Sequence, residues 1–289
     1  LGSSAQIIST FLADTITSRA NGRKGQRATE ESEETLFAFL NAYMAHVDAN
    51  TATLAWPVLV LLARDIMAMH STSKPLVVAA LRLITTASNS VLQMPTADDR
   101  RVRRDMHECF CKLFELVLGL YGRIDIAALR KDDAVHDALA LLEYVAYHVL
   151  PTLSRIRIDS DKATALCTTV VNNVLVPEFR AKGKNVDVDD LVLDLLVSMS
   201  AVPDTHKAWR SVVNDAFMEP RFFALPLHAA SRWAKIVTSW LAGDRERLIE
   251  LITRVTSTTG NIFASREADN IARVLNIRRV SFVIFAGGR

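Results

Sequence analysis

Apolar side chains recur every three or four residues along almost the whole chain. Near its start, Ile7, Phe11, Leu12 and Ile16 fall on one face of a helix, and similar stripes follow at short intervals. Aspartate, serine or proline precedes most of these stripes, as is typical of a helix N-terminus. The pattern predicts about a dozen helices, at residues 7–16, 29–47, 56–69, 74–94, 98–118, 132–150, 160–175, 189–199, 203–217, 226–240, 243–255 and 265–285.

The predicted helices are joined by short connections, and no segment alternates long enough to predict a sheet. Helices joined in this way pack antiparallel, and two of them occupy roughly 40 residues, the period of HEAT and armadillo repeats. We therefore expect an all-α fold: a HEAT/armadillo-like α-solenoid of about a dozen antiparallel helices, forming a single domain over residues 1–289. A compact helical bundle is the alternative, because no consensus repeat is legible.

Composition supports a folded, helix-rich protein and excludes several classes of function. Half of the residues are hydrophobic and 23% are charged, while only 10 are glycine and 8 are proline. The net charge of +2 is too small for a general nucleic-acid binder. Three cysteines without the spacing of a secreted scaffold indicate a reducing, cytosolic compartment. The longest apolar run, residues 54–63, is shorter than the ~20 residues that cross a bilayer as a helix.

Motifs that carry catalysis or bind metals are missing from the sequence. His107, Cys109 and Cys111 lie close together, but on a helix Cys109 points away from the other two. No serine-nucleophile elbow, zinc-protease helix or phosphate-binding glycine loop occurs. The aspartate pairs at 98–99, 132–133 and 189–190 each precede a helix, where capping explains them. We therefore predict no catalytic residue, no metal and no cofactor.

Charge is distributed unevenly along the chain. Residues 201–289 hold 13 lysines and arginines against 8 aspartates and glutamates. This end could therefore contact anionic lipid heads or an acidic partner, although an ordinary solvated surface explains the surplus as well. A second basic cluster, the arginines at 100–104, is flanked by aspartates at 98–99 and 105. We interpret it as a balanced helix face rather than a phosphate site.

Between residues 209 and 285 the chain contains motifs that occur in the same order, with similar gaps, in a known family. They are Trp209-Arg210, Asp215-Ala216-Phe217, Arg221-Phe222-Phe223, Trp233, Asn261-Ile262-Phe263, Ser265-Arg266-Glu267 and Leu275-Asn276-Ile277-Arg278-Arg279-Val280-Ser281-Phe282-Val283-Ile284-Phe285. In these motifs residues 209–285 resemble the C-terminal region of the Dopey family of large eukaryotic trafficking proteins. Upstream of about residue 190 we see only generic helices.

The resemblance implies a non-catalytic scaffold, cytoplasmic and peripheral on Golgi and endosome membranes. Members of the family act in endosome-to-Golgi retrieval and in membrane organisation. Their partners are a large Sec-seven-related scaffold and an aminophospholipid flippase. The family usually continues past the last motif, and this sequence begins at Leu1 rather than methionine. We therefore expect it to be a fragment of a longer chain.

Most residues of the family motifs are expected to be packing residues. These are Trp209, Phe222, Phe223, Trp233, Phe263, Phe282 and Phe285. Arg278 and Arg279 are adjacent and about 100° apart on a helix, so we expect that they are not both buried. One would pair with Glu267 or Asp269, and the other would face a partner; the two arginines are our candidates for a partner or lipid surface.

Other functions remain as alternatives. The same fold could host another helical-repeat adaptor, such as a nuclear-transport or Arf-exchange-factor-like scaffold. A helical enzyme would need a deep pocket with converging titratable groups. Leucine-rich helices near the end of the chain leave a homodimer open, although such stripes more often form intramolecular core.

Overall fold

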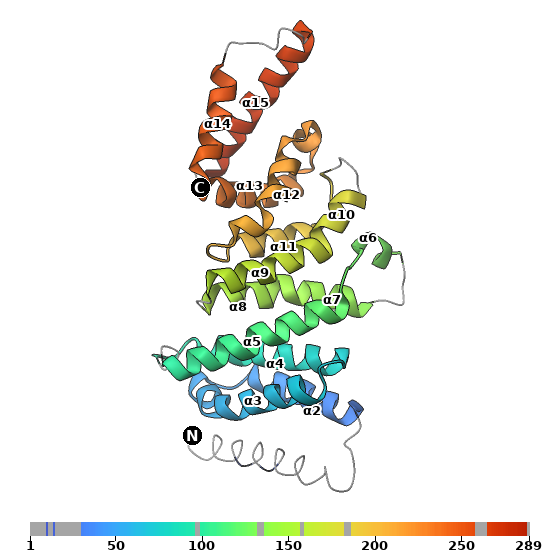
Figure 1. Ribbon diagram of the computed structural model, residues 1–289, viewed down its shortest axis with the longest axis vertical. Helices are drawn as coiled ribbons and strands as arrows, with labels where there is room; N and C mark the ends of the chain where they lie inside the picture. The colour runs from blue at the N-terminus through green and yellow to red at the C-terminus, as the bar shows by residue number, and fades with distance from the viewer. Residues whose placement is uncertain are drawn as a thin grey trace. The chain divides into compact units, whose positions relative to one another are not determined.

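The computed structural model describes residues 10, 14, 30–95, 99–131, 136–156, 159–181, 186–257 and 265–287. All regular secondary structure in these residues is helical, and they contain no strand (Figure 1). The all-α prediction is therefore confirmed. Most of the helix expected at 7–16 lies outside the described residues.

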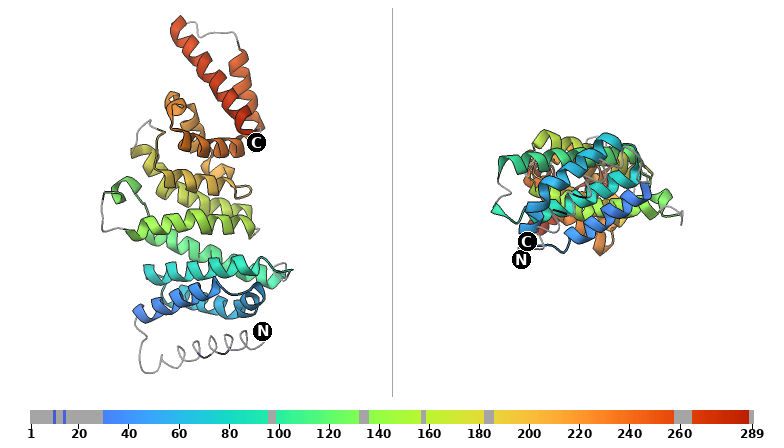
Figure 2. Two further views of the ribbon diagram at one scale, coloured as in Figure 1. Left: turned by 180° about the vertical axis from the view of Figure 1, so that it is seen from behind. Right: turned by 90° about the horizontal axis from the view of Figure 1, so that it is seen from below.

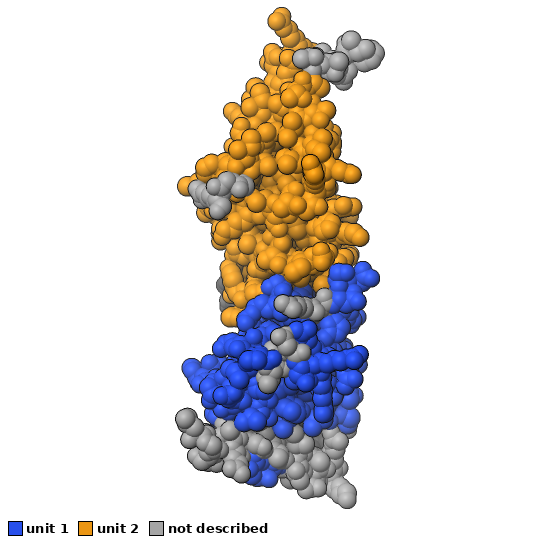
Figure 3. All heavy atoms as spheres, turned by 90° about the vertical axis from the view of Figure 1, so that its left-hand side faces the viewer, with its two compact units in different colours: residues 1–122, 152–162 blue, residues 123–151, 163–289 orange. Residues whose placement is uncertain are grey.

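The helices form two compact units, which Figure 3 distinguishes by colour. Unit 1 comprises residues 1–122 and 152–162, and unit 2 comprises residues 123–151 and 163–289. The single repeat domain and the solenoid expected from the sequence stay predictions.

Unit 1 is built around α4. Its main helices are α2 (Glu30–Met44), α3 (Ala49–Met69), α4 (Lys74–Val91) and α5 (Arg100–Tyr121), and α4 packs against the other three. The side chains of Asp48, Ser73 and Asp99 each accept a hydrogen bond from a backbone N–H in the first turn of the helix that follows. These caps give a partner to N–H groups that have none within the helix.

Helix α3 begins at Ala49, seven residues before its predicted start, because Asp48 caps it. Pro57 therefore lies inside the helix and not in its opening turn. Among the described helices, α3 alone is long and apolar enough to cross a membrane by length and composition. Trp56, Leu59 and Ile66 are nevertheless buried in unit 1. A buried core helix meets the same criteria, so this finding does not by itself indicate a membrane span.

The remaining helices run from residue 126 to residue 287. They are α6 (Ile126–Leu129), α7 (His136–Tyr144), η2 (Val145–Val149), α8 (Leu150–Arg155), α9 (Ser160–Val170), η3 (Val171–Leu175), α10 (Val176–Ala181), α11 (Asp190–Ser200), α12 (His206–Met218), η4 (Pro220–Ala224), α13 (Leu227–Ala242), α14 (Arg245–Thr256) and α15 (Arg266–Gly287). In unit 2, α11 packs against α7, η2 and α13, and α13 packs against α12, α14 and α15. Helices α14 and α15 lie side by side, as both Figure 1 and Figure 2 show.

Two segments of π-helix, η2 and η3, lie within longer helices, and a proline follows each by two residues. The sequence predicted that these helices end at residues 150 and 175, but they continue through Pro151 and Pro177. Pro177 has no N–H for the carbonyl group of Asn173, four residues earlier. Ile124 supplies the missing donor, with its N–H 2.8 Å from the oxygen of Asn173. The wider π turn and this contact let the helix continue past the proline.

Candidate functional site

A buried arginine attaches α15 to the end of α12. Arg279 is only 6% exposed. Its Nε donates to the carbonyl oxygen of Phe217 over 3.1 Å, and its Nη2 donates to that of Met218 over 2.5 Å. Its Nη1 donates to Oδ1 of Asn276 over 2.9 Å. Because α12 ends at Met218, these carbonyl groups have no partner within the helix. Arg279 therefore caps the C-terminus of α12 from another helix.

The charge of Arg279 interacts favourably with the end of α12, but burying that charge costs free energy. The carbonyl end of a helix carries partial negative charge, which a cation stabilises. Burial lowers the pKa of Arg279, and the positive charge of Arg254 lowers it further. Arginine keeps its charge inside proteins, so the hydrogen bonds must compensate for lost hydration.

Aromatic rings from four elements pack together beside Arg279. Phe222 of η4 lies at the centre: its ring centroid is 5.1 Å from that of Phe217, 5.4 Å from that of Trp233 and 5.3 Å from that of Phe282. All three pairs meet edge to face, the geometry that the charge distribution of aromatic rings favours. The cluster joins α12, α13 and α15 to η4.

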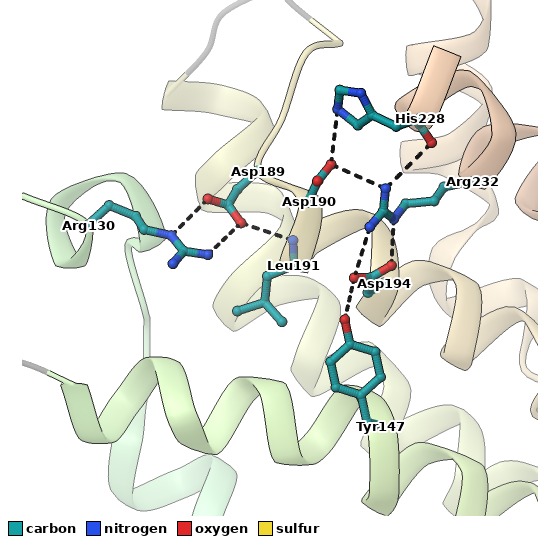
Figure 4. Close-up of polar contacts among 8 residues, drawn as sticks. All are labelled: Arg130, Tyr147, Asp189, Asp190, Leu191, Asp194, His228 and Arg232. Carbon is teal, nitrogen blue, oxygen red and sulfur yellow. Dashed lines mark hydrogen bonds and ion pairs between the residues drawn. The ribbon is translucent and has the colours of Figure 1, made fainter. Parts of the chain in front are cut away.

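A second group of contacts surrounds the start of α11 (Figure 4). Asp189 caps the helix, accepting from the N–H of Leu191 over 2.9 Å. The same carboxylate accepts from Nε and Nη2 of Arg130 at 3.0 and 3.2 Å, so one aspartate both begins α11 and holds the segment after α6. The capping predicted for this aspartate is confirmed.

The next two acids of α11 face α13. Arg232 lies between them, with Nε 2.6 Å from Oδ1 of Asp194 and Nη1 3.5 Å from Oδ1 of Asp190. His228 Nε2 is 3.5 Å from the same oxygen of Asp190. The hydrogen bond with Asp194 raises the pKa of Arg232.

Tyr147, on the π segment η2, completes the network. Its hydroxyl donates to Oδ2 of Asp194 over 2.5 Å. This hydrogen bond, with a smaller effect of burial, raises the pKa of Tyr147 to about 12. Tyr147, Asp190 and His228 are exposed, so the network holds polar groups in fixed positions on the surface. Such a surface suits contact with another polar protein surface.

A groove of about 720 Å³ lies between α10 and α12. Val176, Phe179 and Val212 supply apolar side chains, and Arg180 and Asp215 are charged residues along it. Ser211 and Glu219 also line it, so the groove is mixed in polarity rather than apolar. No ligand class is favoured by these residues.

The cysteines behave as core residues. Cys109, Cys111 and Cys167 are buried, and burial raises their pKa values to about 11, 12 and 12. They are therefore protonated at neutral pH. Because only the thiolate acts as a nucleophile or metal ligand, these cysteines are unsuited to either role. Within the part of the chain that the structure describes, no three His, Cys, Asp or Glu side chains gather in a way that could hold a metal ion.

The two described acids of the basic cluster at the start of α5 have different partners, and Asp98 lies outside the described residues. Asp99 caps the helix. Asp105 is buried and lies 3.0 Å from Arg64, whereas Arg101 is 4.0 Å away. Helix geometry therefore turns this acid inward, toward α3.

Comparison with known proteins places these features in a family. The sequence model of the DOP1 C-terminal region matches residues 39–289. The chain belongs to the DOP1, or Dopey, family. The match begins well before residue 209, where the motifs recognised in the sequence start.

Curated DOP1 proteins from fungi and flies are similar over most of this chain. Protein dop1 of Emericella nidulans is 24% identical over 286 residues, which cover 91% of this chain and 15% of that protein. A DOP1 homolog of Drosophila pseudoobscura is 28% identical, over 89% of this chain and 10% of that protein. Protein DOP1 of Saccharomyces cerevisiae is 22% identical, over 72% of this chain and 12% of that protein. The chain thus spans only 10 to 15% of the length of these relatives. No solved structure matches it significantly.

The predicted packing residues of the Dopey motifs differ in their surroundings. Trp209, Phe222 and Trp233 are buried, and Phe223 and Phe282 are half-buried with rings in contact with Phe222. Phe285 is 63% exposed, so its prediction as a core residue is wrong. On the helix it points away from the side that carries Arg279. Phe263 lies outside the described residues.

The two motif arginines also differ in their exposure. Arg278 is exposed, whereas Arg279 is buried against α12, so the expectation of a partner or lipid surface is corrected for Arg279. The pairing expected with Glu267 or Asp269 is absent among the described residues; Asn276 and two carbonyl groups take that place. Arg278 stays a candidate.

Proposed function

We propose that this chain is part of a non-catalytic scaffold that acts in membrane trafficking by binding other proteins. Membership of the DOP1 family carries the proposal. The same membership favours this function over a nuclear-transport or Arf-exchange-factor-like adaptor.

The finer proposal follows the family resemblance. The scaffold would act in endosome-to-Golgi retrieval and in Golgi and endosome membrane organisation, peripherally on those membranes. Its partners would be a large Sec-seven-related scaffold and an aminophospholipid flippase. Its helices would stack as a HEAT-like solenoid, an architecture that offers a long surface to partners.

Several structural features support a binding role. Buried, protonated cysteines are poor nucleophiles. The polar network around α11 is partly exposed and is held in place by contacts among α11, α13 and η2. Rigid polar groups of this kind contribute specificity at protein interfaces.

Affinity capture with the purified 289-residue chain tests the proposal. The chain is immobilised and exposed to a detergent extract of Golgi and endosome membranes, and the bound proteins are identified by mass spectrometry. The same chain, unfolded before use, is the control. We expect the folded chain to recover the Sec-seven-related scaffold or the flippase, and the control to recover neither. A folded chain that recovers neither partner contradicts the assignment of partners.

A further inference from the structure

The middle of α3 is apolar on every side. Residues 54–63 are an unbroken apolar run, long enough for nearly three turns of helix. Leu59 is fully buried, whereas Leu54, Pro57 and Leu61 lie about 140–160° around the helix from it. Leu54 is 65% exposed, Leu61 is 54% exposed, and Pro57 is exposed as well. A helix that is apolar all round is normally buried on every side, but α3 is buried on one side only.

Polar groups bound this exposed apolar stretch at both ends. The exposed Asn50 lies before it, and the half-buried Asp65 follows it. Arg64 is the one cation of α3, and it donates to Asp105 and to Glu108, each over 3.0 Å. The outward side of α3 therefore offers apolar contact between residues 54 and 61, and the cation nearby is already paired.

This surface is too small to hold a separate protein by itself. Between residues 51 and 63, its exposed apolar side chains are those of Leu54, Pro57 and Leu61, beside the half-buried Val58. A stable interface between separate proteins uses roughly 20–30 residues on each side. A segment of the same polypeptide needs much less contact, because the connecting chain gives it a high effective concentration at the surface. The size of the surface therefore favours an occupant that is joined to it covalently.

Most of a DOP1 protein lies outside this chain. The chain spans 10 to 15% of the length of its relatives, and the family model that matches it describes a C-terminal region. In those relatives a long polypeptide precedes this region. Helix α3 lies near the start of the described residues, and elements that are consecutive in sequence are usually adjacent in space. The preceding polypeptide is therefore well placed to reach α3.

We propose that an apolar helix of the polypeptide that precedes this chain in the full-length protein packs on the exposed side of α3, at Leu54, Pro57 and Leu61. The contact would complete the burial of α3 and attach this C-terminal region to the rest of the protein. The proposal rests on membership of the DOP1 family and goes beyond the proposed function. It depends neither on the trafficking role nor on the partners.

Three other occupants are less well supported. A membrane-spanning helix needs ~20 apolar residues, more than the run at 54–63 provides. An anionic membrane surface attracts cations, but Arg64 is paired and Asp65 lies close by. A second copy of the chain would face the same limit of size. The third is residues 7–16 of this chain, which carry an apolar stripe of their own.

Cysteine labelling of the 289-residue chain and of the full-length protein tests the proposal. Leu54→Cys and Leu61→Cys each place a thiol on the exposed side of α3. Leu227→Cys is the matched control, because Leu227 is 86% exposed and belongs to unit 2. Each protein is treated with N-ethylmaleimide, and mass spectrometry of the peptide that contains the new thiol gives its labelling rate. Circular dichroism confirms that each variant is folded.

We expect rapid labelling at all three positions in the 289-residue chain. In the full-length protein, the thiols at positions 54 and 61 should react at least about tenfold more slowly, because they become accessible only when the contact opens. The thiol at position 227 should react at the same rate in both proteins. The protection at positions 54 and 61 should not change when the full-length protein is diluted, because its occupant is part of the same polypeptide.

Several results would overturn the proposal. Equal labelling rates at positions 54 and 61 in the two proteins show that nothing covers α3. Slow labelling at all three positions of the full-length protein shows general shielding. Slow labelling at positions 54 and 61 in the 289-residue chain assigns the contact to residues 1–29, or to a second copy if dilution relieves it. Protection of the full-length protein that appears only with lipid vesicles assigns the surface to a membrane.

Discussion

Arg279 of α15 donates a hydrogen bond to the carbonyl oxygen of Phe217, near the end of α12, across 62 positions of sequence. Its neighbour Arg278 is exposed. Two adjacent arginines of the same family motif therefore have different roles: one holds the last helix in place, and the other remains available at the surface.

Replacing Arg279 with alanine should destabilise unit 2. The change leaves the carbonyl oxygens of Phe217 and Met218 without their donor in a buried position. Losing a charged donor to buried acceptors costs about 2–4 kcal/mol of unfolding free energy. Urea denaturation followed by circular dichroism measures the loss. If R279A unfolds at the same urea concentration as the unmodified chain, the cap contributes nothing.

Phe222 and Phe285 offer a matched pair of phenylalanines. Phe222→Ala removes the ring at the centre of the aromatic cluster and should cost about 3–5 kcal/mol. Phe285→Ala removes a ring that is 63% exposed and should change stability by less than about 1 kcal/mol. Denaturant titration of both variants compares the two losses. Similar values for both would contradict the positions described for these rings.

Tyr147 should make stability depend on pH in the alkaline range. The pKa of Tyr147 is raised from 10.0 to about 12, so the folded protein binds the phenolic proton more tightly than the unfolded chain does. The stabilisation is complete below about pH 10 and is lost as pH rises through about 12. The difference in unfolding free energy between the unmodified chain and Y147F should shrink over this interval. Asp194→Asn should lower the pKa of Tyr147, which ultraviolet difference titration against Y147F detects.

The three cysteines should resist alkylation while the protein is folded. Their thiols are buried and their pKa values are raised to about 11 or 12, so little thiolate exists at neutral pH. Iodoacetamide labelling followed by mass spectrometry should show slow modification of the native chain and rapid modification of all three in denaturant. Rapid native labelling of Cys109 would show that its surroundings open readily.

The sequence predicts most helices because their signals are local. Asp99 and Asp189 precede apolar stripes at helical spacing, and both cap a helix in the structure. The continuations through Pro151 and Pro177 could not be predicted in this way. A donor to the carbonyl group of Asn173 comes from Ile124, which is distant in sequence, and this contact helps the helix to continue beyond its proline.

The contacts of the candidate site could not be predicted from the sequence, because they also join residues that are distant in the chain. The spacing of Asp190 and Asp194, and of His228 and Arg232, places each pair on one helix face. Nothing local indicates that the two faces meet. Likewise, Arg278 and Arg279 look alike in sequence, and only the packing of α15 on α12 assigns one of them to the interior.

The division of roles between these two arginines is the central claim, and a crossed comparison of R278A and R279A tests it most directly. For each variant, the thermal midpoint of unfolding is measured. We predict that R279A lowers the midpoint by several degrees while R278A leaves it unchanged, because only Arg279 has buried partners. If the two variants have the same midpoint, the arginines have no separate structural roles and the account is wrong.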